Sequence, residues 1–312
     1  MKLVVNNLCK SFNDCVAVSN LSFHLETGHI TGFVGPNGAG KTTTMRIMST
    51  IEQCTSGVVL LEGQSILDYP EIARKSIGFV PDTLPLNDDM TIHEYLDFFA
   101  RAYGLKTPDR QDTVEKLEEF TNLTGIKEKL INSLSKGMKQ RVSIARALIN
   151  DPPFILMDEP AAGLDPRARI ELRELLRVLA EQGKGILISS HILTELSEIC
   201  DSTVIIEKGR LLKSGSIEEV VTQTVSTEGG REIQIKVLAK ADEMAKILLE
   251  EPMVSKVAVN GNQIEFVYEG TDEEASALVA KLFSKGYAII SFGFKQQSLE
   301  SVFMNITKGD VQ

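Results

Sequence analysis

The stretch "GPNGAGKT", residues 35–42, has the spacing G-x-x-x-x-G-K-[ST] of a phosphate-binding loop. Its glycines let backbone N–H groups surround the β- and γ-phosphates of a nucleotide, and Lys41 supplies a cation for the same oxygens. The stretch "HITGFVG" before the loop predicts a strand and "KTTTMRIMST" after it a helix, so a chance glycine-rich turn explains the match poorly. The sequence thus predicts a nucleotide-contacting set: Gly35, Pro36, Asn37, Gly38, Ala39, Gly40, Lys41, Thr42 and Thr43.

A second stretch, "FILMDEP", residues 154–160, supplies the acids that such a loop requires. Four apolar residues predict a buried strand, and two carboxylates follow it directly. Asp158, at the strand end, is predicted to bind Mg²⁺ together with the hydroxyl of Thr42. Glu159 is placed to polarise an attacking water. A solvated acidic loop is the alternative, but an Mg²⁺-nucleotide site accounts for an acid at this strand end.

The stretch "LSKGMKQR", residues 134–141, predicts a second anion site. It begins a helix that continues as "VSIARALI", with Ser135 as a favourable N-cap and Gly137 leaving the backbone bare. The free N–H groups of such a helix start attract an anion. One phosphate loop already serves one nucleotide, so the second site needs a separate explanation.

Elsewhere the pattern predicts two domains. In residues 1–216, strand and helix signals alternate, which favours a mainly parallel sheet with helices on both faces. Residues from about 84 to 150 are predicted to be helical, because apolar residues recur there at helical spacing. A polar stretch, 217–230, is a predicted linker. The order strand, helix, strand, strand, helix, strand then predicts a small α+β domain of ferredoxin-like outline over residues 231–312.

The composition limits the possible partners and location of the chain. A net charge of −10 argues against a nucleic-acid partner, because binding there rests on neutralising phosphates. No apolar run approaches the roughly 20 residues of a membrane span, and the N-terminus lacks the apolar core of a signal peptide. The four cysteines and four histidines form no ligand pattern. We therefore expect a cytoplasmic protein with reduced thiols.

These motifs, in this order, resemble those of the ATP-binding cassette (ABC) family. The signature of that family is usually written LSGGQ-x-x-R; Leu134, Ser135, Gly137 and Arg141 match it, while Lys136 and Met138 replace a glycine and the glutamine. Other features also fall in the family order: an aromatic in "KSFND", the turn "AGLDP", and a histidine ending "ILISSH". The resemblance covers residues 2–215. It implies the cassette form of the P-loop NTPase fold, a mixed sheet with a helical subdomain.

The resemblance also explains the second anion site. In this family two cassettes pair head to tail, and each signature helix caps the ATP held by the other copy, so it implies a homodimer that binds ATP and Mg²⁺. Ser135 and Gly137 would then donate to the γ-phosphate across the dimer, and Asp165 would sit at the dimer boundary. The implied catalytic residues are Glu159 as general base, His191 at the γ-phosphate, and Lys41.

Two further residues are placed by the resemblance. Phe12 would stack on adenine; its alternative is a core aromatic in an edge strand. Asp82, in "PDTLP", stands where the family usually has a glutamine that reaches the metal. Acidic replacements occur in some exporter cassettes, but aspartate is shorter than the glutamate expected there. The sequence therefore leaves open whether Asp82 binds Mg²⁺.

The ending "QQSLESVFMNITKG" resembles the close of accessory domains in bacterial drug-, antibiotic- and polymer-exporter cassettes. Its alternative is a packing helix that presents Leu299, Val302, Phe303 and Ile306 on one face. The implied function is an ATPase subunit that drives a separate membrane permease, for export, from the inner face of the cell membrane. An importer cassette and a non-transport cassette ATPase are alternatives, and a kinase or GTPase is disfavoured by the signature motif. The transported substrate is not indicated.

Overall fold

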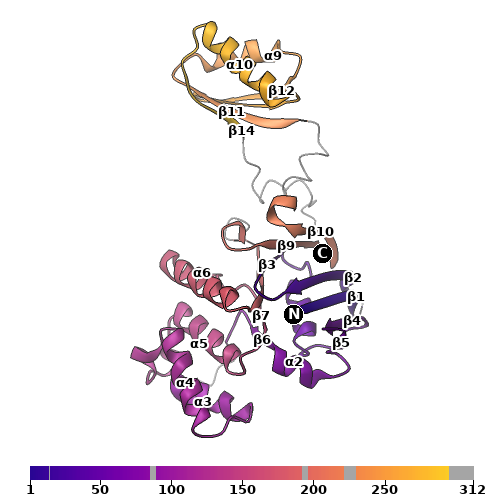
Figure 1. Cartoon of the computed structure of the whole chain (residues 1–312), viewed down its shortest axis with the longest axis vertical. Helices are drawn as coiled ribbons and strands as arrows, with labels where there is room; N and C mark the ends of the chain where they lie inside the picture. Colours follow the sequence, from indigo (N-terminus) through magenta and orange to yellow (C-terminus); the bar gives the residue numbers. More distant parts are fainter. Residues whose placement is uncertain (14, 85–88, 192–195, 221–229, 295–312) are drawn as a thin grey trace. The chain divides into compact units, whose positions relative to one another are not determined.

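The computed structural model describes residues 1–13, 15–84, 89–191, 196–220 and 230–294 (Figure 1). They form two compact units, one built on Met1–Ile217 and one on Glu218–Val302. The boundary falls within the stretch predicted as a linker. Residues 217–220 of that stretch are helical. Among the described residues, no helix has the length and apolar character needed to cross a bilayer.

The larger unit is built around a six-stranded sheet. Its order is β10 (Arg210–Ser216), β9 (Ser202–Glu207), β3 (Ile30–Val34), β8 (Gly185–Ser190), β7 (Phe154–Met157) and β6 (Ile77–Val80). All neighbours are parallel except β9 and β10, which form a hairpin. Every residue of β3, β7 and β8 is buried, as expected for parallel strands covered on both faces. Because these strands are parallel, the loops that follow β3 and β7 lie at the same, carboxyl-terminal end of the strands.

A second, antiparallel sheet covers part of the first. Its order is β2 (Cys15–Glu26), β1 (Lys2–Phe12), β4 (Ser56–Leu61) and β5 (Gln64–Ser65). Burial alternates along parts of β1, β2 and β4, so one face points to the core. Its apolar residues share a single core with β3, β7 and helix α1 (Lys41–Met48). The second sheet and α1 thus pack together on the main sheet.

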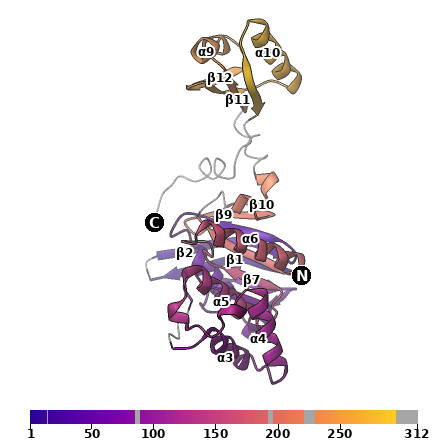
Figure 2. The ribbon, with the colours of Figure 1, turned by 90° about the vertical axis from the view of Figure 1, so that its left-hand side faces the viewer.

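The helices form a distinct part of the larger unit, which both views place at one end of it (Figures 1 and 2). They are α3 (Ile92–Ala102), α4 (Asp109–Phe120) and α5 (Lys136–Leu148), with short 3₁₀ segments at Thr124–Ile126 and Ile131–Ser133. Their apolar faces enclose a core of their own, which includes Tyr95, Leu96 and Val142. The unit also contains α2 (Pro70–Ser76) and α6 (Pro166–Glu181).

The smaller unit has the predicted order of elements: β11 (Arg231–Val237), α9 (Ala241–Leu249), β12 (Val254–Asn260), β13 (Gln263–Tyr268), α10 (Asp272–Ser284) and β14 (Ile289–Phe294). The sheet order β12-β13-β11-β14 is antiparallel throughout and is that of a ferredoxin-like fold. Alternate residues of β11 and β13 pack with both helices in a separate core. The closing motif, with Leu299, Val302, Phe303 and Ile306, lies outside the described residues.

We predict that a chain ending at Gly229 folds and binds ATP, because the larger unit and the smaller unit each have a core of their own. Circular dichroism and titration with a fluorescent ATP analogue would measure this. A chain ending at Glu207 is the control: it lacks β10, the antiparallel partner of β9, and should not fold. Failure of both chains to fold would mean that the tail contributes to the core of the cassette.

Candidate functional site

The phosphate loop joins β3 to α1. At two of its glycines, neighbouring backbone leaves no room for a side chain. Gly40 precedes α1 with φ +97°, and a Cβ there would lie 2.4 Å from the carbonyl oxygen of Ala17. A Cβ on Gly35 would lie 2.5 Å from the carbonyl oxygen of Ile206 in β9. Because no side chain fits at either position, the loop backbone packs directly on β2 and β9.

We predict that Gly40→Ala destabilises the protein and abolishes nucleotide binding. The residue would have to adopt a left-handed backbone, at about 1–2 kcal/mol. Its methyl group would also collide with a backbone oxygen, which adds about 1–3 kcal/mol of overpacking. Gly63→Ala is the matched control, since Gly63 has φ +82° and a methyl group there would meet nothing within 4 Å. Urea unfolding should show the smaller loss for Gly63→Ala; equal losses would contradict this account.

Lys41 lies inside the loop and is 6% exposed. Its Nζ donates to the carbonyl oxygens of Gly35 at 2.8 Å and Pro36 at 3.2 Å. The Glu159 Oε1 atom is 3.6 Å away. Burial lowers the pKa of the Lys41 ammonium, although the Glu159 and Asp158 carboxylates act in the opposite direction. The cation is therefore held at the loop by carbonyl dipoles and one nearby carboxylate.

A pocket of about 430 Å³ opens beside this loop. Besides Phe12, Cys15, Ala17 and Glu159, its lining comprises Asn37, Gly38, Ala39, Gly40, Lys41, Thr42 and Thr43. Phe12 is 44% exposed, and Lys10 Nζ lies 4.4 Å from the centroid of its ring. The alternative of a core aromatic is thus wrong for Phe12. Its exposed ring is available to a planar ligand in the same pocket as the phosphate loop.

The acids at the end of β7 are held by a hydroxyl from β8. Asp158 is 4% exposed, and its Oδ1 accepts a hydrogen bond from Ser189 Oγ at 2.7 Å. The same Oγ accepts from the backbone N–H of Glu159 at 2.8 Å. Sequence reasoning missed Ser189; its signal is a hydroxyl at the end of the otherwise apolar run "GILIS".

Glu159 lies close to both His191 and Lys41, the other two predicted catalytic residues. Its backbone is left-handed, with φ +48°, which is rare for a residue with a side chain. Its Oε2 lies 2.8 Å from His191 Nδ1, while its other oxygen faces Lys41. The predicted catalytic residues Glu159, His191 and Lys41 are therefore in contact. A carboxylate beside an open pocket and a buried cation can accept a proton from water at a bound phosphate.

The signature residues lie elsewhere. Ser135 caps α5, its hydroxyl accepting from Met138 N–H at 3.3 Å, and Asp165 caps α6 in the same way through Ala168 N–H at 3.0 Å. Neither residue lines the nucleotide pocket, nor does Gly137. Within one chain these three predicted contacts are thus not brought to the phosphate loop.

Asp82 is exposed and does not line the nucleotide pocket either. It follows β6, whose Val80 carbonyl accepts from the Asp158 N–H at 2.9 Å, so the two strand ends are adjacent. Among the described residues, no group of three or more His, Cys, Asp or Glu side chains could hold a metal ion. A metal at Thr42 and Asp158 would therefore need further oxygens, which phosphate groups and water provide.

The sequence matches two family models and is similar to known ATP-binding proteins along nearly its whole length. Residues 18–162 match the model of the ABC transporter family, and residues 215–307 that of the C-terminal domain of ATP-binding proteins like DrrA1-3. An uncharacterized ABC transporter ATP-binding protein, YxlF of Bacillus subtilis (strain 168), is 33% identical over 97% of this chain and 99% of its own length. The Nod factor export ATP-binding protein I of Paraburkholderia xenovorans (strain LB400) is 34% identical, over 97% and 96%.

Solved structures agree with the fold. The ATP-binding subunit of an ABC transporter is 29% identical, with a TM-score of 0.66 over 80% of this chain and 100% of its own length. An ABC transporter cassette in its ADP conformation is 26% identical, with a TM-score of 0.64 over 73% of this chain and 96% of its own. The similarity thus includes cassettes that bind a nucleotide.

Proposed function

The chain belongs to the ABC transporter family as an ATP-hydrolysing, ATP-binding subunit, and on that premise we propose that two copies pair head to tail to drive export through a separate membrane permease. One observation carries the pairing. The nucleotide pocket of one chain includes the phosphate loop and Glu159, but not Ser135, Gly137 or Asp165. A head-to-tail pair would bring the helix start at Ser135 to the partner's ATP, and two-fold symmetry makes that contact twice.

In this proposal each residue of the pocket has a defined task. The loop N–H groups and Lys41 bind the β- and γ-phosphates, and the exposed ring of Phe12 stacks on adenine. Glu159 accepts a proton from the attacking water, while His191, 2.8 Å from its Oε2, orients that carboxylate and reaches the γ-phosphate. Ser135 and Gly137 of the second copy donate to the same phosphate. Stabilisation of the developing charge on phosphate is the main work of such sites.

The side chains of Thr42 and Asp158 are suited to bind Mg²⁺. Thr42 is exposed and lines the pocket, and Ser189 orients the buried carboxylate of Asp158. These two residues would hold the ion, whose charge would offset that of the phosphate oxygens. Hard oxygen donors of this kind are what Mg²⁺ prefers. Asp82, two residues beyond β6, would act through a water at most, because aspartate is a short side chain.

Several observations support export and a membrane partner. Relatives similar over nearly their whole length include ATP-binding proteins named for Nod factor export, and the second unit matches an accessory-domain family. These relatives favour export over import, and a transporter subunit over a cassette acting on ribosomes or DNA. Because these relatives are named as ATP-binding proteins, the permease would be a separate protein. The chain would then work at the inner face of the cell membrane.

We expect Asp82→Ala to separate coupling from chemistry. Basal ATPase activity should stay within about tenfold, or about 1.4 kcal/mol, because Lys41, Asp158 and Glu159 are unchanged. Stimulation by the reconstituted permease should fall much further. Asp82→Gln, which introduces the usual residue of the family, should recover part of that stimulation. The measurement is the ATPase rate with and without permease in proteoliposomes.

Two results of that experiment would count against the proposal. If the permease does not stimulate the wild-type chain, the proposed coupling to a membrane partner is wrong. If Asp82→Ala abolishes basal hydrolysis while ATP still binds, Asp82 takes part in the chemistry itself.

A further inference from the structure

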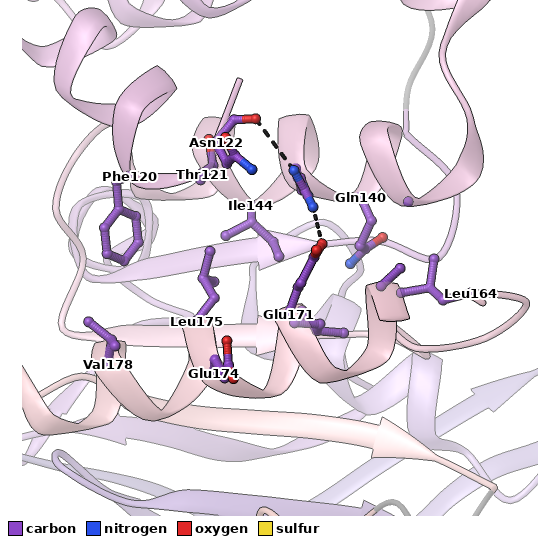
Figure 3. A pocket seen from close by; sticks show the side chains of 14 residues that line it. Phe120, Thr121, Asn122, Gln140, Ile144, Leu164, Glu171, Glu174, Leu175 and Val178 are labelled. Atoms are coloured by element: carbon purple, nitrogen blue, oxygen red, sulfur yellow. Dashed lines mark hydrogen bonds and ion pairs between the residues drawn. The ribbon is translucent and has the colours of Figure 1, made fainter. Parts of the chain in front are cut away.

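A second pocket, of about 290 Å³, lies between α5, α6 and the end of α4 (Figure 3). It shares no residue with the nucleotide pocket. Its apolar lining includes Phe120, Ile144, Leu164, Leu172, Leu175 and Val178. The volume is about twice the roughly 150 Å³ that suffices for benzene in an engineered apolar cavity. A molecule of about two rings therefore fits the space.

One polar group in this lining has no partner. Gln140 is 8% exposed, and its Nε2 has no hydrogen-bond acceptor among the described residues. Figure 3 shows its amide nitrogen turned toward the α6 side of the pocket. A buried N–H donor without an acceptor costs free energy, which a ligand oxygen would recover. The pocket thus offers an apolar enclosure with a donor that needs an acceptor.

The charges of the pocket decide what kind of acceptor fits. Arg141 pairs with Glu171, and its Nη1 also donates to the Asn122 carbonyl at 3.4 Å. Glu171 also accepts from Arg167 Nε at 3.2 Å, so this carboxylate has two cationic partners. Glu174 adds a second carboxylate to the lining, and Arg141, the cation in the lining, is already paired. A carboxylate ligand would therefore lose its hydration without gaining a cation of its own, whereas an uncharged carbonyl needs none.

From this geometry we propose that the pocket binds a small, uncharged, largely apolar molecule that presents one carbonyl oxygen to Gln140 Nε2. The ligand would contact both α5, which begins at the Ser135 cap, and α6, which begins at the Asp165 cap. Occupancy would therefore fix the spacing between these two helices. The pocket is an effector site of the cassette, apart from the phosphate loop but next to Gly137, which lines it and is proposed to contact the partner's ATP.

Three probes built on one two-ring skeleton test the chemistry: tetralone carries a ketone, tetralin has no acceptor, and tetralin carboxylate carries an anion. Methyl-resolved NMR of the full chain would follow Ile144 and Leu175, with Leu248 and Leu282 in the other core as references. Tetralone should shift the first pair saturably and leave the references unchanged. The other two probes should bind about tenfold more weakly, equivalent to about 1.4 kcal/mol.

Two variants test the role of the amide. Gln140→Leu should weaken tetralone to the level of tetralin and leave tetralin unchanged. Ser143→Ala is the matched control, because Ser143 is also buried and unpaired on α5 but does not line the pocket. It should bind all three probes as the wild type does. If Gln140→Leu does not fold, the ranking of the three probes on the wild-type chain still tests whether the pocket prefers a carbonyl.

The proposal is overturned if no probe gives a saturable shift at Ile144 and Leu175, if tetralone is not preferred, or if Gln140→Leu keeps the preference. The effector role is measured separately, as the change that saturating tetralone makes in the ATPase rate, and this step rests on the proposed function. Binding without any change in rate would refute the effector role. An inactive wild-type chain that still binds tetralone would instead refute the proposed function and leave the pocket assignment intact.

Discussion

Glu159→Gln is expected to lower the rate of ATP hydrolysis by about 10²- to 10⁴-fold, the usual contribution of a general base. The glutamine amide keeps the size of the side chain but cannot accept a proton from water. The carboxylate it replaces lies 2.8 Å from His191 Nδ1 and 3.6 Å from Lys41 Nζ, so the change is made at the centre of the site. ATP should still bind, because the loop and Lys41 are intact. A malachite-green phosphate assay would measure the rate.

The same variant tests the pairing of two copies. Since ATP is bound but not consumed, the head-to-tail dimer should persist, and gel filtration with Mg-ATP should show a species of twice the mass. Glu181→Gln, an exposed residue at the end of α6, is the control and should behave like the wild type. A Glu159→Gln chain that stays monomeric under saturating ATP would contradict the head-to-tail arrangement.

Two variants that are each inactive should restore activity when they are mixed. Lys41→Ala removes the cation of the phosphate loop, and a lost charge-assisted hydrogen bond of about 1.5–3 kcal/mol weakens ATP binding by about 10- to 150-fold. Ser135→Phe blocks the start of α5, which would serve the partner's nucleotide. In a mixed dimer, one site combines both defects and the other has neither. An equal mixture should therefore recover about a quarter of wild-type activity, since half of the dimers are mixed and each has one intact site.

Mixing gives this result only if each site uses residues from two chains. Mixtures of Lys41→Ala with Glu159→Gln are the control: both residues lie at the same pocket of one chain, so a mixed dimer has no intact site. Circular dichroism should show that each single variant folds, because Ser135→Phe also loses a helix cap worth about 1 kcal/mol. Recovery in the control mixture, or none in the test mixture, would contradict the shared sites.

The sequence by itself determined the phosphate loop, the acids at the end of β7 and the order of elements in the smaller unit. Each of these depends on local patterns. The left-handed backbone of Gly40 needs glycine at that position, and the buried strand β7 corresponds to an unbroken apolar run in the sequence. The element order of the tail follows from periods of two and 3.6 residues, which lie within a few turns of chain.

Only the tertiary structure decided which distant residues meet. Ser189 reaches Asp158 and His191 reaches Glu159 across about thirty residues of sequence, because β7 and β8 are neighbours in a parallel sheet. The exposure of Phe12, the second sheet over the main one, and the unpaired Gln140 between α5 and α6 likewise depend on how elements pack. A local pattern fixes the face that an element buries, but not the element that covers it; packing between distant segments selects that partner.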